Sequence, residues 1–144
     1  MTSVHFSSNT EEWATPDELF KDLSWAFGRF TLDPCATKEN AKCGIYMTKR
    51  DDGLAQSWGQ HRVFMNCPYG RGITEKWVKK AWEESEKGAT VVCLLPARTD
   101  TRWWQTYCTR GYVKFLPGRL KFGDAKNSAP FPSAIVVFGR FFSR

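Results

Sequence analysis

The sequence lacks both the long hydrophobic runs and the ligand spacings that mark several large protein classes. No apolar run approaches the roughly 18 residues that a membrane-spanning helix needs. No secretory or transit segment is recognisable, so we expect the five cysteines to be free thiols in a reducing, soluble compartment. The cysteines form no Cys-x-x-Cys pair and no histidine doublet lies near them, which argues against a zinc site. We therefore expect no bound metal.

Internal repeats, linkers and breaks in composition are also absent, which argues against a second domain. The 144 residues are 42% hydrophobic and include seven tryptophans and eleven phenylalanines, which is enough apolar material for one core. Residues 1–12 are polar and show no periodicity. We expect a flexible arm there and a single folded domain over residues 13–144.

Acidic residues are outnumbered by basic ones, and the net charge is +6. No basic amphipathic helix of the kind that binds membrane surfaces is present, so we expect no membrane partner. Positive side chains recur instead beside aromatic and glycine-rich stretches, which favours a nucleic-acid partner over a merely solvated face. The basic residues singled out as contacts are Arg98, Arg102, Arg119 and Lys121. Ion pairs of Arg98 with Asp100 and of Arg119 with Asp124 are an equally good interpretation.

Residues 16–27 carry the start signature and the periodicity of a helix. Thr15 is placed to cap this helix, Pro16 suits its first position, and apolar residues recur on one of its faces. Residues 29–32 then favour a strand, and a proline after Asp33 ends it. Asp33 is either a site residue at the carboxyl end of this strand or a turn residue that accepts hydrogen bonds from its own backbone.

The central segment, residues 62–70, is typical of a buried strand that stops at turn residues. In open α/β sheets, ligands gather at such strand ends. Residues 73–87 follow as an amphipathic helix and residues 90–95 as a strand covered on both faces, which predicts a right-handed crossover in a parallel sheet. Further elements are expected as strands over residues 44–48, 112–116, 119–122 and 134–138, the late ones partly antiparallel, and as a short helix over 101–109.

The segment Asn66-Cys67-Pro68-Tyr69 resembles the Asn-Pro-Pro-Tyr motif of amino-group DNA methyltransferases. Further segments stand in the order found in the small phage-type DNA N-6-adenine methyltransferases. They are Trp13–Pro16, Leu32–Pro34, Asp52–Leu54 with Trp58, Leu94–Thr101 with Trp103-Trp104, and Gly118–Phe122. The resemblance implies a compact α/β fold: a single-domain, Rossmann-like sheet of the S-adenosylmethionine-dependent methyltransferases, mostly parallel with antiparallel late strands.

The resemblance also implies an activity, the transfer of a methyl group from S-adenosylmethionine to the exocyclic 6-amino group of adenine in DNA. For a phage-derived chain the location would be the cytoplasm of a bacterial host. Asn66, Cys67, Pro68 and Tyr69 would be catalytic. The side-chain oxygen of Asn66 and the main-chain carbonyl of Cys67 or Pro68 would accept the two amine hydrogens, and the ring of Tyr69 would stack on the base.

Cofactor residues follow from the same resemblance. Asp33 and Pro34 are expected at S-adenosylmethionine, Thr15 and Pro16 on the other side of the same pocket, and Asp52 near the adenosine. A paired adenine must be flipped out of the duplex, and the basic residues would supply the backbone contacts that hold the opened strand.

The sequence departs from the family pattern in three ways. Cys67 stands where the motif has proline, which removes one rigid φ angle, and Cys35-Ala36-Thr37 replaces the glycine-rich turn after the first strand. The chain has no room for a separate target-recognition domain, so specificity must come from a few loops, from a partner protomer in a homodimer, or be low. Cytosine N4 methylation by the same motif and a catalytically inactive nucleic-acid-binding relative are the alternatives.

Overall fold

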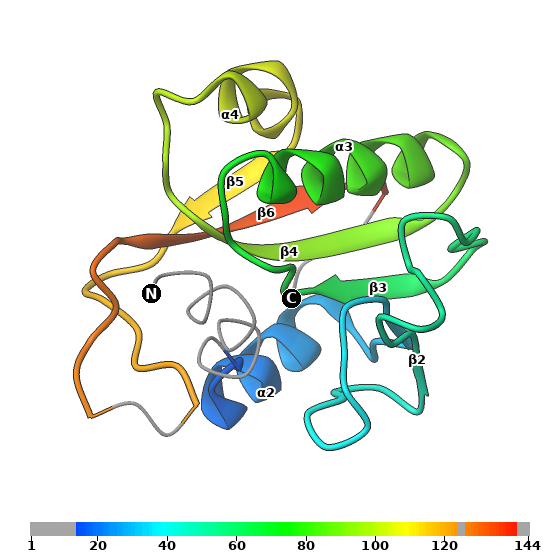
Figure 1. Ribbon diagram of the computed structural model, residues 1–144, viewed down its shortest axis with the longest axis horizontal. Coiled ribbons are helices and arrows are strands. Elements are labelled where there is room, and N and C mark those ends of the chain that lie inside the picture. The colour runs from blue at the N-terminus through cyan, green and yellow to red at the C-terminus, as the bar shows by residue number, and fades with distance from the viewer. Residues whose placement is uncertain (1–13, 124–125, 141–144) are drawn as a thin grey trace.

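The computed structural model describes residues 14–123 and 126–140, so the arm expected over residues 1–12 lies outside the described residues. One six-stranded mixed sheet runs through the molecule, with strand order β2-β1-β3-β4-β6-β5 (Figure 1). Its strands are β1 (Leu32–Asp33), β2 (Ile45–Tyr46), β3 (Arg62–Met65), β4 (Thr90–Pro96), β5 (Tyr112–Phe115) and β6 (Ser133–Phe138). The helices are α2 (Asp17–Phe27), α3 (Ile73–Glu86) and α4 (Arg102–Thr106), followed by the 3-10 helix η1 (Cys108–Arg110).

The strand directions confirm the expected mixed sheet. Strands β2, β1, β3 and β4 are mutually parallel, β6 runs antiparallel to β4, and β5 runs antiparallel to β6. From β1 the chain goes outward to β2 and then returns to the opposite side of β1 as β3. The carboxyl ends of β1 and β3 therefore flank the topological switch point, where α/β sheets bind their ligands.

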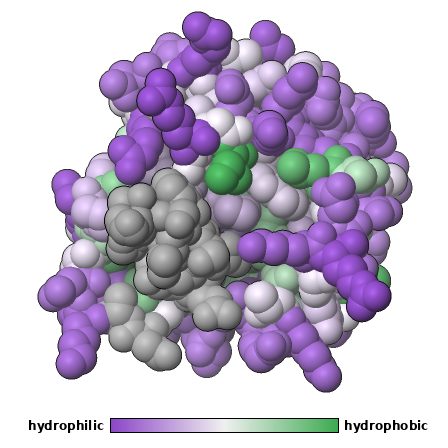
Figure 2. All heavy atoms as spheres, in the orientation of Figure 1, coloured by the Kyte–Doolittle hydropathy of each residue, from purple (hydrophilic) through white to green (hydrophobic). Residues whose placement is uncertain are grey.

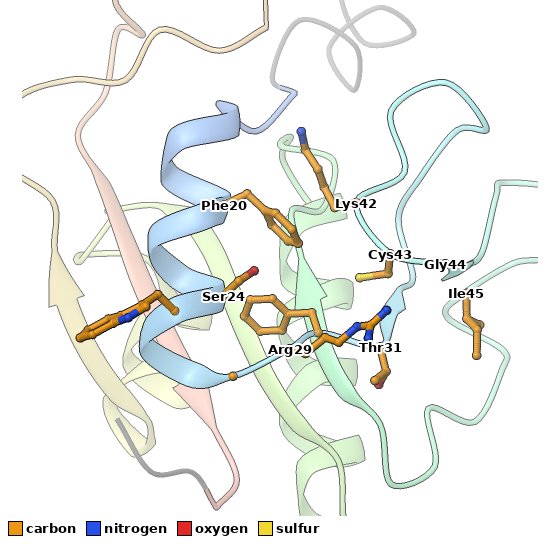
Figure 3. Close-up of a pocket in the computed structure, with 11 residues that line it drawn as sticks. Phe20, Ser24, Arg29, Thr31, Lys42, Cys43, Gly44 and Ile45 are labelled. Carbon is orange, nitrogen blue, oxygen red and sulfur yellow. The ribbon is translucent and has the colours of Figure 1, made fainter. Parts of the chain in front are cut away.

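Helices α2 and α3 cover opposite faces of the sheet (Figure 3). On the α2 face, the rings of Phe20, Phe30 and Phe64 pack against one another, with 5.1 Å between the centroids of Phe20 and Phe64. Because side chains alternate along a strand, Phe64 and Asn66 project toward the same side of β3. Asn66 is thereby directed toward the beginning of α2.

Strands β4 and β6 form the centre of the core, and nearly all of their residues are buried. The strand expected over residues 119–122 is not formed. Gly118 has a positive φ of 68° and turns the chain away after β5, and β6 already pairs with β4 and β5 on its two edges. Phe122 is nevertheless fully buried, so this segment packs on the core without joining the sheet.

A buried carboxylate ties the loop after β2 to α3. Glu84 is only 2% exposed and accepts a 2.6 Å hydrogen bond from the backbone N–H of Trp58, while Lys80 and Lys87 lie 3.3 and 3.5 Å from its second oxygen. Burial alone would raise the pKa of Glu84, but the Trp58 hydrogen bond and the two lysines hold it below its ordinary value of 4.5. The indole of Trp58 in turn donates to the carbonyl of Gly53, which fixes the loop.

Hydrophilic side chains dominate the outer surface on the side where α3 lies, as its amphipathic pattern predicts (Figure 2). Across residues 14–123 and 126–140, the model contains no helix that is both long enough and apolar enough to span a bilayer.

Candidate functional site

The loop after β3 begins with an asparagine whose orientation is set by the segment before α2. The side-chain nitrogen of Asn66 donates a 3.0 Å hydrogen bond to the hydroxyl of Thr15, which is 6% exposed. The prediction that Thr15 caps α2 is wrong: the helix begins after Pro16 with no side-chain cap. The hydroxyl of Thr15 is instead directed across the sheet end, and it fixes which edge of the Asn66 amide carries the oxygen.

A second residue, Thr74, holds the rest of the loop. Its buried hydroxyl accepts a 3.0 Å hydrogen bond from the N–H of Gly70 and donates a 3.1 Å hydrogen bond to the carbonyl of Pro68. Within the described part of the chain, the carbonyl of Cys67 accepts no hydrogen bond. Of the two carbonyls predicted as amine acceptors, that of Pro68 therefore accepts a hydrogen bond from Thr74, whereas no described residue donates to that of Cys67.

Tyr69 is tied to the neighbouring strand. Its hydroxyl donates a 3.0 Å hydrogen bond to the carbonyl of Leu94 in β4, and its ring meets those of Phe122 and Phe131 edge-on, with centroids 6.2 and 5.7 Å away. Burial raises the pKa of the Tyr69 hydroxyl, so it stays protonated as a donor. The ring is 9% exposed and lines a surface pocket, so only that limited part of it is offered to a ligand.

Cys67 points into the core. The residue is 2% exposed, and burial raises the pKa of its thiol far above that of a free cysteine. A protonated, enclosed thiol is a poor nucleophile. The enclosed sulfur of Cys67 is therefore unsuited to act as a nucleophile.

Asp33 organises the loop after β1. Its two carboxylate oxygens accept hydrogen bonds from the backbone N–H groups of Cys35, at 3.2 Å, and Lys42, at 3.0 Å. Burial raises the pKa of Asp33, against the lowering effect of these two hydrogen bonds. The turn interpretation therefore accounts for its contacts, yet Asp33 also lines a small cavity of about 20 Å³ together with Thr15 and Asn66.

A larger pocket, of about 530 Å³, opens beside this cavity. The loops after β1 and β2 form most of its wall, including the predicted cofactor residues Pro34 and Asp52, and Pro68 and Trp77 complete it. Cys35 lines both the pocket and the small cavity, so the two adjoin. The loops pack tightly here, since a Cβ atom at Gly53 would come within 2.4 Å of the carbonyl oxygen of Pro34.

Two of the four basic residues predicted to contact nucleic acid, Arg98 and Arg102, lie around a third pocket, of about 540 Å³, on the other side of Tyr69. Arg119 and Lys121 are exposed on the segment that follows β5. The alternative partner of Arg119, Asp124, lies outside the described residues, whereas Arg98 and Asp100 are described and form no ion pair with each other. The alternative of an Arg98–Asp100 ion pair is therefore not formed, and the nucleic-acid contact of Arg98 stays a prediction.

A further hollow, of about 710 Å³, lies at the opposite edge of the sheet, beside the amino ends of β1 and β2. Phe20, Arg29, Lys42 and Ile45 are among the residues that line it (Figure 3). It adjoins the amino ends of β1 and β2, opposite to the strand ends where α/β sheets bind ligands. None of the residues predicted from the sequence as site residues lines it.

Comparison with known proteins agrees with this geometry. The family model for DNA N-6-adenine-methyltransferase (Dam) matches residues 3–143. The chain belongs to this Dam family. It is 34% identical to the DNA N-6-adenine-methyltransferase of Escherichia phage T1 over 93 residues, which are 64% of this chain and 38% of that protein. It is also 37% identical over 65 residues to the putative methyltransferase YfdM of Escherichia coli K12, covering 41% of this chain and 71% of the relative.

Membership of the Dam family confirms the resemblance read from the motif and its neighbours, and the mixed α/β sheet agrees with a methyltransferase fold. The alignment spans less than two fifths of the phage T1 relative. In the described part of this Dam-family chain, no group of three histidine, cysteine or acidic side chains is arranged to hold a metal ion.

Two residues at the site were missed from the sequence. Thr74 sits four positions after the motif glycine, Gly70, in a stretch that was interpreted only as helix. Arg71 follows the motif directly and lines the same pocket as Arg98 and Arg102. A basic residue in the loop at the carboxyl end of a parallel strand was the signal that would have identified Arg71.

Proposed function

We propose that this chain transfers a methyl group from S-adenosylmethionine to the exocyclic 6-amino group of adenine in DNA. One observation carries the proposal: hydrogen bonds from neighbouring residues determine which two oxygen atoms of one loop can accept the amine hydrogens. The hydroxyl of Thr15 accepts a hydrogen bond from the nitrogen of the Asn66 amide, which orients the amide oxygen away from Thr15. Thr74 occupies the carbonyl of Pro68, which leaves the carbonyl of Cys67 as the second acceptor.

Two acceptors are what this reaction requires. The lone pair of an exocyclic amine is delocalised into the purine ring, so the amine is a weak nucleophile. Accepting one hydrogen at Asn66 Oδ1 and the other at the Cys67 carbonyl draws the nitrogen toward tetrahedral geometry and localises its lone pair. The carbon–nitrogen bond forms as the carbon–sulfur bond breaks, and the amine then loses one proton to solvent. No carboxylate base is needed at the nitrogen.

The residues at the switch point fit the cofactor. S-adenosylmethionine supplies an electrophilic methyl group on a positively charged sulfur. The 530 Å³ pocket offers the flat, apolar walls of Pro34, Pro68 and Trp77 to an adenine ring, and the carboxylate of Asp52 to ribose hydroxyls. The adjoining cavity with Thr15, Asp33 and Asn66 leads toward the amine acceptors. Pro16, the N-cap residue of α2, directly follows Thr15.

The test is methyl transfer in vitro. Purified chain is incubated with DNA and methyl-labelled S-adenosylmethionine, and the digested nucleosides are separated by mass. We expect label in N6-methyl-2′-deoxyadenosine. Label in N4-methyl-2′-deoxycytidine would assign the same chemistry to the other amino base, and cofactor and DNA binding without label would identify an inactive relative.

The matched variants are Asn66→Ala and Asn127→Ala, since Asn127 is exposed and distant from the acceptor loop in sequence. Asn66→Ala should lower the rate constant at least 100-fold, in the range seen when one acceptor or donor is removed from a polarising site. Asn127→Ala should retain the wild-type rate. Full activity in a folded Asn66→Ala chain would contradict the assigned role.

A further inference from the structure

Three arginines from separate segments converge on the 540 Å³ pocket. Arg71 comes from the loop after β3, Arg98 from the loop after β4, and Arg102 is the first residue of α4. All three belong to the carboxyl-end edge of the sheet, and Tyr69 of the acceptor loop forms part of the same wall. The pocket therefore adjoins the proposed reaction site on the side away from the cofactor pocket.

These arginines keep their charge available. Lys42, Lys80 and Lys87 supply all the cations of the ion pairs formed within residues 14–123 and 126–140, so the three arginines pair with no described acidic residue. All three are exposed, and among the described residues of the lining Glu75 is the sole acidic one. The lining thus carries a formal net charge of +2, from three cations and one anion. Guanidinium groups that share one pocket without acidic partners favour an anionic ligand, and phosphate is an anion that arginine binds bidentately.

The rest of the wall is aromatic. Trp103 and Phe131 line the pocket, and the guanidinium carbon of Arg98 lies 5.6 Å from the centroid of the Phe131 ring. Aromatic rings interleaved with arginines are typical of sites for single-stranded nucleic acid, where bases stack and phosphates pair with cations. The volume is that of a site for one small molecule, which admits a nucleotide but not a duplex.

We infer that the pocket is a binding site for the phosphodiester backbone of an unpaired DNA strand, held by Arg71, Arg98 and Arg102 with a base against Trp103. The inference rests on the proposed function in taking DNA as the nucleic acid. It adds that the chain binds a single strand on its own account, through residues that take no part in polarising the amine.

The experiment measures binding of a fluorescein-labelled, 12-nucleotide single-stranded DNA by anisotropy between 50 and 300 mM salt. Each phosphate contact to a single strand contributes about 0.7 to the slope of log K against log salt. Arg71→Ala, Arg98→Ala and Arg102→Ala should each reduce the magnitude of that slope by about 0.7 and weaken binding roughly fivefold at 0.1 M salt. Arg29→Ala is the matched control, because Arg29 is also exposed but lines the hollow at the amino ends of the strands.

A variant that is expected to tighten binding controls for loss of affinity through misfolding. Glu75→Gln removes the one negative charge of the lining, so it should tighten binding of the same oligonucleotide by about twofold or more, which no loss of folding would do. Slopes unchanged by the three arginine variants would overturn the inference. So would preferential binding of the equivalent duplex or of the equivalent RNA strand with the same arginine dependence.

Failure of this inference is distinguishable from failure of the proposed function. Asn66→Ala should lower the rate constant of methyl transfer at least 100-fold and leave oligonucleotide binding within twofold of wild type. A wild-type chain that binds the single strand through its arginines but transfers no methyl group would retain this site and refute the enzyme. Methyl transfer with no arginine-dependent binding of the single strand would support the enzyme and refute this binding site.

Discussion

Replacing Thr74 with valine tests whether one buried hydroxyl positions the acceptor loop. Thr74 is 3% exposed, and its hydroxyl joins the N–H of Gly70 to the carbonyl of Pro68. Valine has nearly the same shape, so no cavity is created and only the two hydrogen bonds are lost. At about 1 kcal/mol for each hydrogen bond, Thr74→Val should destabilise the fold by about 2 kcal/mol.

Thermal unfolding measures that change. With an unfolding entropy of about 2.1 cal/mol/K per residue, 2 kcal/mol in this 144-residue chain corresponds to a decrease of about 7 °C in Tm. Thr74→Ser is the matched control, because it keeps the hydroxyl and loses one buried methyl group, which costs about 0.8 kcal/mol or about 3 °C. Both variants are thus destabilised, but only Thr74→Val removes the two hydrogen bonds that hold the loop.

Activity separates the two variants. In Thr74→Val, the carbonyl of Pro68 and the N–H of Gly70 lose their partner, so the loop that carries the acceptors can shift. Because a displacement of about 1 Å at a reacting centre costs about 100-fold in rate, we expect kcat for methyl transfer to fall between about 10-fold and 100-fold. The KM for S-adenosylmethionine should stay nearly constant in both variants. A valine variant with the same kcat as the serine variant would refute the positioning role.

Three further predictions concern residues around the site. Glu84→Ala leaves the buried N–H of Trp58 without an acceptor and should cost about 3 kcal/mol in urea unfolding, against about 1 kcal/mol for Glu84→Gln, which keeps an acceptor. Because the folded-state pKa of Glu84 lies below 4.5, its contribution is present above that pH and is lost as the pH falls through the folded-state value, so wild type and Glu84→Gln should converge in acid. Thr15→Val removes the hydrogen bond from Asn66 and should slow single-turnover methyl transfer about 10-fold. Thr106→Val, on the exposed side of α4, should leave the rate unchanged. Equal rates for the two variants would exclude the orienting role of Thr15. Burial raises the pKa of the Cys108 thiol to about 12, so iodoacetamide at pH 8 should leave Cys108 unmodified in the native chain and modify all five cysteines in urea, as counted by mass spectrometry.

Local patterns predicted the regular elements well. Helix α3 and strands β3 and β4 lie where the periodicity places them, because their apolar residues face one continuous core. The strand expected over residues 119–122 is the instructive failure. Its composition suits a strand, but Gly118 with its positive φ redirects the chain after β5, and Phe122 packs into the core instead of lying in a strand beside β5. Pairing partners are a property of the whole fold, which a local window does not contain.

At the site, too, local motifs could be read from the sequence, whereas contacts between distant residues could not. The motif identified Asn66 and its neighbours, and the order of the elements predicted that the strand ends would converge. The prediction that Thr15 caps α2 failed because the hydrogen bond of its hydroxyl reaches Asn66, 51 positions away, whereas a helix cap bonds within the next turn. Asp33 was left open between a site and a turn, and its contacts combine the two: it binds backbone N–H groups of its own loop and lines the cavity shared with Asn66.

The substitution of cysteine for proline at position 67 takes its meaning from these long-range contacts. Proline would restrict one φ angle of the loop, a local constraint. In this chain the loop is instead held from three directions: Asn66 by Thr15 before α2, Pro68 and Gly70 by Thr74 in α3, and Tyr69 by the carbonyl of Leu94 in β4. Three anchors on three different elements define the position of a five-residue loop more completely than one ring does. The carbonyl that Cys67 presents is therefore fixed by its neighbours, and the thiol only fills the core beneath it.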